Sequence, residues 1–77
     1  MTQDKLIAII AQILELPPEQ VHETSGVNET ENWDSLKNMM IMMEIENRYG
    51  LRFDFDRYFD AATVKDIRAL VEAAQVG

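Results

Sequence analysis

Ser35 is the residue of this chain with the clearest chemical potential, because its hydroxyl stands at the start of a predicted helix. Either Asp34 or Ser35 can cap a helix that begins at Ser35 and runs to Tyr49, and Gly50 is placed to end it. A helix N-terminus offers N–H groups and the positive end of the helix dipole, which stabilise a phosphate ester by roughly 0.3 to 1 kcal/mol. The pattern fits a plain capping serine and also a serine that another enzyme modifies.

Catalysis by Ser35 itself is disfavoured by its surroundings. The serine does not lie in a Gly-x-Ser-x-Gly motif, and His22 is the only histidine, so the parts of a hydrolytic triad are too few. The glycines Gly26, Gly50 and Gly77 are scattered and form no phosphate-binding loop. We therefore expect no catalytic residue in this chain.

Metal binding is disfavoured as well. His22 lies in an acidic segment without a second ligand type at metal spacing, so we expect it to be a surface residue. Three acids have a spacing similar to that of a calcium loop: Asp54, Asp56 and Asp60. However, Tyr58 and Phe59 stand where a ligand and a glycine are needed, and no glutamate closes the loop. We expect no metal site.

The predicted helix over 35–49 has apolar residues on two opposite sides, although one side is enough to dock a helix in a small domain. At about 100° per residue, one arc holds the residues that we assign to the core: Ile41, Met42, Ile45 and Tyr49. The other arc, which we call the methionine face, consists of Leu36, Met39, Met40 and Met43. The rest of the chain could bury this face, but methionine also lets one surface adapt to several partners. We predict that these four residues bind partner proteins.

Length and composition indicate one small domain that spans residues 1–77. The chain has 77 residues, of which 47% are apolar, so a single modest core is expected. It contains no cysteine, which excludes disulfides, thiolate metal sites and a thiol of its own. No apolar run is long enough to span a bilayer, and the N-terminus does not resemble a signal peptide. We expect a cytoplasmic monomer that does not enter membranes.

The charge distribution argues against nucleic-acid binding. The net charge is −7, whereas phosphate backbones require clustered lysine and arginine. Residues 1–36 hold seven of the 14 acidic residues but only one of the seven basic ones. This acidity can steer a basic partner surface towards the chain, or it can serve as a solvated face that keeps the domain soluble.

The pattern elsewhere predicts two further main helices. Between Thr2, a possible N-cap, and Pro17, helical spacing joins Leu6, Ile7, Ile9, Ile10, Ile13 and Leu14. The last helix begins at Thr63, where Asp66 takes the place of the usual glutamate of a capping box. Its apolar residues are Val64, Ile67, Leu70, Val71 and Ala74.

The connecting segments complete an all-α fold. Residues 17–33 have no sustained period and form a long loop, in which Val21 and Val27 are isolated apolar anchors. In residues 51–55, apolar and charged side chains alternate as in a β-strand, but the sequence shows no second strand to pair with it. We therefore expect a loop that inserts Leu51, Phe53 and Phe55 into the core. Residues 56–60 form a short helical turn. The prediction is a small four-helix bundle with three main helices and one short helix.

At four places the chain resembles the acyl carrier protein family, which includes the peptidyl carrier domains of nonribosomal synthetases. The first two elements are Asp34-Ser35-Leu36 at the start of the second helix and the segment 46–50 at its end. The third element, Leu51-x-Phe53, follows directly, and the fourth is Thr63-Val64-x-Asp66-Ile67 at the start of the last helix. These elements occur in the family order and at the family spacing, over nearly the whole chain.

This resemblance implies a carrier function rather than an enzyme activity. It implies that a phosphopantetheinyl transferase attaches 4′-phosphopantetheine from coenzyme A to Ser35, with Asp34 in a supporting role. The thiol of that arm then holds an acyl or aminoacyl group as a thioester. The partners implied are the transferase, a loading enzyme and a downstream synthase or transferase. Within the methionine face, Leu36, Met39 and Met43 match family positions that contact them.

The chain also departs from the family pattern. Fatty-acid carriers usually have acidic residues along the second helix, where this chain has Lys37, Met40, Asn47 and Arg48. Trp33 before the Asp-Ser pair is closer to discrete carriers of specialised metabolism. These differences favour polyketide or nonribosomal-type pathways over primary fatty-acid metabolism, and partner recognition through apolar contacts.

Two functions other than a carrier stay open. One is an unmodified helical adaptor that binds a partner helix through its methionine face. The other is a regulatory module that receives ordinary phosphate at Ser35.

Overall fold

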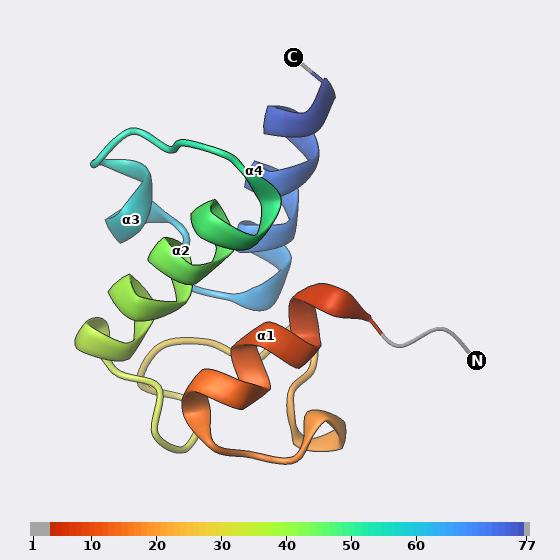
Figure 1. The fold of residues 1–77 in the computed structure, drawn as a ribbon. Helices are drawn as coiled ribbons and strands as arrows, with labels where there is room; N and C mark the ends of the chain where they lie inside the picture. The colour runs from red at the N-terminus through yellow and green to blue at the C-terminus, as the bar shows by residue number, and fades with distance from the viewer. Residues whose placement is uncertain (1–3, 77) are drawn as a thin grey trace.

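The fold is a helical bundle, as the sequence predicts. The computed structural model describes residues 4–76 and contains, within this range, three main helices, two short helical segments and no β-strand. The elements are α1 (Lys5–Leu14), the 3-10 helix η1 (Pro18–Gln20), α2 (Ser35–Tyr49), α3 (Arg57–Asp60) and α4 (Val64–Val76). Figure 1 shows the long segment between α1 and α2 running across one end of the helices. Only η1, within this segment, was not expected.

Helix α1 has its N-cap two residues after the candidate cap Thr2. The carboxylate of Asp4 accepts hydrogen bonds from the N–H groups of Leu6 and Ile7 at 3.1 and 3.3 Å, so Asp4 is the N-cap. Asp4 thus has the role for which Thr2 was a candidate, and Thr2 lies outside the described residues. At the other end, the side-chain amide of Asn32 donates to the carbonyl oxygen of Leu14 at 2.9 Å. This bond ties the long loop to the end of α1.

Helix α2 has the predicted bounds. Asp34, rather than Ser35, is the N-cap, because its carboxylate accepts a hydrogen bond from the N–H of Lys37 at 2.9 Å. Gly50 ends the helix with a φ of 65°, a conformation that favours glycine, and its N–H donates to the carbonyl oxygen of Glu46. Ser35 is thus the first residue inside the helix.

The core lies between α1, α2 and α4. The predicted core residues Ile41, Met42 and Ile45 of α2 are fully buried, and Tyr49 is half-buried with the ammonium of Lys5 at 4.6 Å from its ring centre. The other buried apolar residues are Leu6, Ile9, Ile10, Ala11, Leu14, Val21, Trp33, Ala61, Val64, Ile67 and Val71.

One predicted core residue, Phe55, lies outside. Leu51 and Phe53 pack half-buried against the core as expected, but Phe55 is 66% exposed. The chain turns after Phe53, since the N–H of Arg57 donates to the carbonyl oxygen of Asp54 at 2.9 Å, and the strand-like alternation ends there. The ring of Phe55 instead contacts that of Phe59 on the surface, with the ring centres 5.2 Å apart.

The long loop is attached to the start of α4 by backbone hydrogen bonds. The N–H of Val27 donates to the carbonyl oxygen of Ala62 at 2.9 Å, and the N–H of Val64 donates to that of Ser25 at 3.0 Å. Gly26 lies between these bonds, and a Cβ atom there would be 2.5 Å from the carbonyl oxygen of Ala62. Only glycine permits this close approach.

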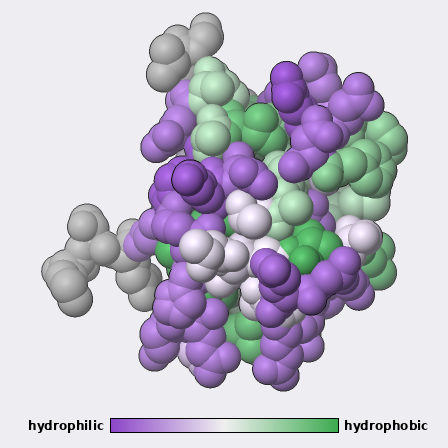
Figure 2. All heavy atoms as spheres, turned by 180° about the vertical axis from the view of Figure 1, so that it is seen from behind, coloured by the Kyte–Doolittle hydropathy of each residue, from purple (hydrophilic) through white to green (hydrophobic). Residues whose placement is uncertain are grey.

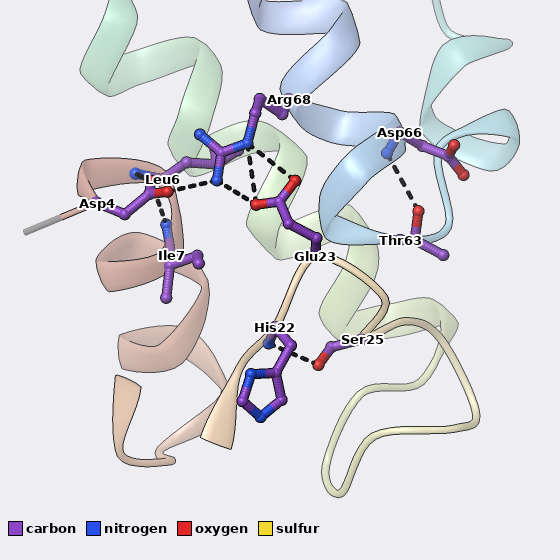
Figure 3. Close-up of polar contacts among 9 residues, drawn as sticks. All are labelled: Asp4, Leu6, Ile7, His22, Glu23, Ser25, Thr63, Asp66 and Arg68. Atoms are coloured by element: carbon purple, nitrogen blue, oxygen red, sulfur yellow. Dashed lines mark hydrogen bonds and ion pairs between the residues drawn. The ribbon is translucent and has the colours of Figure 1, made fainter. Parts of the chain in front are cut away.

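The start of α4 carries a capping interaction and an ionic tether, both drawn in Figure 3. The hydroxyl of Thr63 accepts a hydrogen bond from the N–H of Asp66 at 3.1 Å, which confirms the predicted cap. In a full capping box the carboxylate of Asp66 would accept the N–H of Thr63, but it accepts the N–H of Ala62 instead. One turn further, Arg68 pairs with Asp4 and Glu23.

The tether holds α4 to the cap of α1 and to the long loop. Burial opposes ionisation of Asp4, but hydrogen bonds from Arg68 and from the N–H of Ile7 outweigh it, and they hold the pKa of Asp4 below its ordinary value. Because the three charged groups are partly exposed, each pair is worth at most about 1 kcal/mol.

A buried polar contact links α2 to the segments around it. Asn38 is the one buried polar or charged residue of the described range, and its side-chain oxygen accepts the indole N–H of Trp33 at 3.0 Å. Its amide group donates to the carbonyl oxygens of Tyr58 and Ala61, both at 3.0 Å. No local sequence pattern indicated this contact.

Replacement of Asn38 by alanine is expected to destabilise the fold strongly. The change leaves the indole N–H and two carbonyl oxygens without their partner in the interior, which costs about 2 to 4 kcal/mol. Urea unfolding followed by circular dichroism measures the free energy of unfolding, and Asn47→Ala, on the exposed side of the same helix, is the control. An equal loss in both variants would contradict the assigned role of Asn38.

Candidate functional site

Ser35 lies exposed at the first position of α2, beside a small pocket. The pocket has a volume of about 90 Å³. Ser35 contributes to its lining together with Val27, Asn38, Met39, Tyr58, Phe59 and Ala62. The hydroxyl is therefore accessible from solvent and adjoins a mainly apolar recess between α2, α3 and the long loop.

The backbone at the start of α2 is suited to an anion. The Asp34 carboxylate accepts a hydrogen bond from the N–H of Lys37, and the Asp34 carbonyl oxygen accepts one from the N–H of Asn38 at 2.9 Å. Helix geometry leaves the N–H groups of Ser35 and Leu36 without an acceptor inside the helix. A phosphate on the Ser35 oxygen would lie near these groups and at the positive end of the helix dipole.

The methionine face flanks Ser35 and is largely uncovered. Leu36, Met40 and Met43 are 67%, 44% and 56% exposed, whereas Met39 is half-buried and lines the pocket beside Ser35. The rest of the described chain thus covers only one of the two apolar sides of α2. The simpler explanation of the methionine face is that the rest of the fold buries it. This holds only for Met39, and only in part.

Two aromatic side chains near the pocket lie on the surface, although the sequence did not indicate this. Phe55 and Phe59 are 66% and 59% exposed, and Phe59 lines the same pocket as Ser35. Viewed from behind, the surface is mostly hydrophilic, with hydrophobic areas between the charged side chains (Figure 2). Strand-like alternation suggested a buried Phe55, and no local signal marked Phe59 as exposed.

Helix α3 has no fully buried residue, and polar contacts join it to α2 while Tyr58 packs against the edge of the core. The carboxylate of Glu46 accepts the N–H of Phe53 at 2.8 Å and the hydroxyl of Tyr58. Burial, together with the hydrogen bond and the negative charge of Glu46, raises the pKa of Tyr58 to about 12. The Tyr58 hydroxyl thus ties α3 to Glu46 of α2, and Tyr58 lines the pocket beside Ser35.

Two features are absent from the described range, residues 4–76. No group of three or more histidine, cysteine, aspartate or glutamate residues is arranged to hold a metal ion. No helix in this range combines the length and the apolar character needed to cross a membrane.

Comparison with known proteins explains this arrangement. The family model of the phosphopantetheine attachment site matches residues 4–71. Acyl carrier protein 3 of Ralstonia nicotianae is 35% identical over 71 residues, which cover 92% of this chain and 82% of that protein. The chain belongs to the acyl carrier protein family. It is accordingly a carrier at the family level rather than a catalyst, and its prosthetic group is a covalently attached 4′-phosphopantetheine.

The site fits an acyl carrier protein. A covalent arm requires a hydroxyl that an enzyme can reach, N–H groups near the phosphate, and space beside the attachment point. The exposed Ser35, the start of α2 and the adjoining pocket provide all three.

The cap at Asp34 should matter for the stability of this site. Asp34→Ala removes the acceptor for the N–H of Lys37 and is expected to lower the free energy of unfolding by about 1 kcal/mol, whereas Asp34→Asn should lose only a few tenths. Asp56→Ala is a matched control, since Asp56 precedes α3 without a side-chain capping bond. Chemical unfolding measures all three, and equal losses in Asp34→Ala and Asp56→Ala would disprove the capping role.

Proposed function

We propose that Ser35 carries the 4′-phosphopantetheine arm and that the chain delivers acyl or aminoacyl thioesters to biosynthetic enzymes. The observation that supports this most is the exposed hydroxyl of Ser35 at the start of α2 in a chain of this family. Ser25, the other serine, is half-buried, and its oxygen accepts the N–H of His22 at 2.8 Å. Ser35 is thus the serine better placed for an enzyme to reach.

The surrounding residues have distinct roles in this proposal. Asp34 fixes the first turn of α2, and its exposed carboxylate beside Ser35 supports the metal ion of the modifying transferase. The N–H groups of Ser35 and Leu36 face the phosphate. The arm supplies the thiol that this cysteine-free chain lacks, and a tethered intermediate has a raised effective concentration at each partner.

Partner enzymes are proposed to dock on the methionine face. Its exposed residues adjoin Ser35, and Lys37 and Met40 replace acidic residues expected in fatty-acid carriers. Docking then relies more on apolar contact than on charge, which favours a dedicated partner set in specialised metabolism. We infer a monomer of a single domain that works in the cytoplasm with a transferase, a loading enzyme and a downstream synthase.

Incubation with coenzyme A and a broad-specificity phosphopantetheinyl transferase tests the attachment site. Intact-mass analysis should show one phosphopantetheinyl increment, which Ser35→Ala abolishes and the matched variant Ser25→Ala retains. The absence of an increment under conditions that modify a control carrier would favour the unmodified adaptor, which the exposed methionine face also supports. An increment that survives in Ser35→Ala would refute the assigned site.

A charge on the methionine face should impair partner recognition. Met40→Glu is expected to reduce turnover with the partner enzymes by about tenfold, because the carboxylate loses its water when the apolar surfaces meet. Gln12→Glu adds the same charge at an exposed position of α1 and should have little effect. Unchanged or faster turnover with Met40→Glu would contradict recognition through apolar contacts.

A further inference from the structure

The methionines of α2 differ sharply in exposure. Four of the five methionines of the chain lie at positions 39–43. Met40 and Met43 are 44% and 56% exposed, whereas Met42 is completely buried and Met39 is half-buried. Exposure governs how readily a thioether is oxidised, so neighbouring residues of one helix should differ in reactivity.

We propose that Met40 and Met43 are modification sites for hydroperoxides, and that their oxidation blocks docking on the methionine face. In each reaction the thioether sulfur forms an S–O bond with the peroxide while the O–O bond breaks, and hydrogen peroxide leaves as water. The sulfur loses two electrons and the peroxide gains them. The effect on docking depends on the proposed function, whereas the oxidation sites do not.

Oxidation changes the chemistry of this surface without disturbing the interior. A sulfoxide is polar, and its oxygen is a strong hydrogen-bond acceptor that must lose water when an apolar partner surface covers it. Met40 and Met43 point into solvent, so their sulfoxides need no space in the core, and Met42 keeps its place between the helices. Docking is expected to weaken while the fold persists.

In the unmodified chain, no cysteine thiol reacts with peroxide in competition with the methionines. The chain has no cysteine, and a thiol is present only once the arm is attached. Methionine sulfoxide is reduced again by enzymes specific for its two epimers. The change is therefore a reversible switch rather than permanent damage.

Peptide mapping of the full unmodified chain after limited treatment with hydrogen peroxide tests the sites. Trypsin cleaves after Lys37 and Arg48, so one peptide, 38–48, contains all four methionines, and fragmentation locates each added oxygen. Met40 and Met43 should be oxidised at least about tenfold faster than Met42, and urea should remove the difference. Equal rates in the folded protein would overturn the assignment.

The rate of phosphopantetheine transfer before and after peroxide treatment tests the effect on docking. Treatment should slow transfer by about tenfold without loss of helical circular dichroism, and the two reductases should restore the rate. Each variant is compared with its own untreated sample. The double variant Met40→Leu/Met43→Leu should lose no more than about twofold on treatment, whereas Met42→Leu should remain sensitive.

The outcomes separate this inference from the proposed function. An unchanged transfer rate with both sulfoxides in place, or loss of helical structure on oxidation, overturns the switch. No transfer to the untreated protein contradicts the carrier function, and the docking effect is then rejected with it. In that case the peptide map still decides whether Met40 and Met43 are the oxidation sites.

Discussion

The arrangement of the site depends on the side chain of Asn38. From one buried position on α2 it joins Trp33, before the helix, to the backbone of Tyr58 and Ala61, which lie at and after α3. These groups would otherwise be unpaired in the interior, where an unsatisfied polar atom costs about 1 to 3 kcal/mol. The Asn38 side chain thereby fixes the N-terminal half of α2 against the two segments that form the pocket beside Ser35.

With this end of α2 fixed, the helix presents two apolar surfaces that differ in burial. Ile41, Met42 and Ile45 anchor it in the core, so the opposite side must face outward, with the exposed Met40 and Met43 along it. A helix that is apolar on both sides is usually buried on both. The uncovered side is therefore the surface on which we propose that partners dock beside Ser35.

Local sequence rules predicted most of the fold. The bounds of α2 follow from Asp34 and Gly50, whose capping roles depend only on neighbouring backbone, and Thr63 marks the start of α4 in the same way. The failures have more than one source. Nothing near Asn38 indicates that its partners are 20 and 23 residues away, and the alternation around Phe55 does not show that the chain turns at Asp54. The placement of Ser35 and the methionine face was predictable, whereas the pocket was not.

Methyl NMR of the methionines tests the division of α2 into two surfaces most directly. The chain is labelled at the methionine methyl groups and titrated with a phosphopantetheinyl transferase. The signals of Met40 and Met43, and to a lesser degree that of Met39, should shift on binding, while that of the buried Met42 should stay in place. Binding that leaves Met40 and Met43 unchanged, or that perturbs Met42 most, would contradict the account.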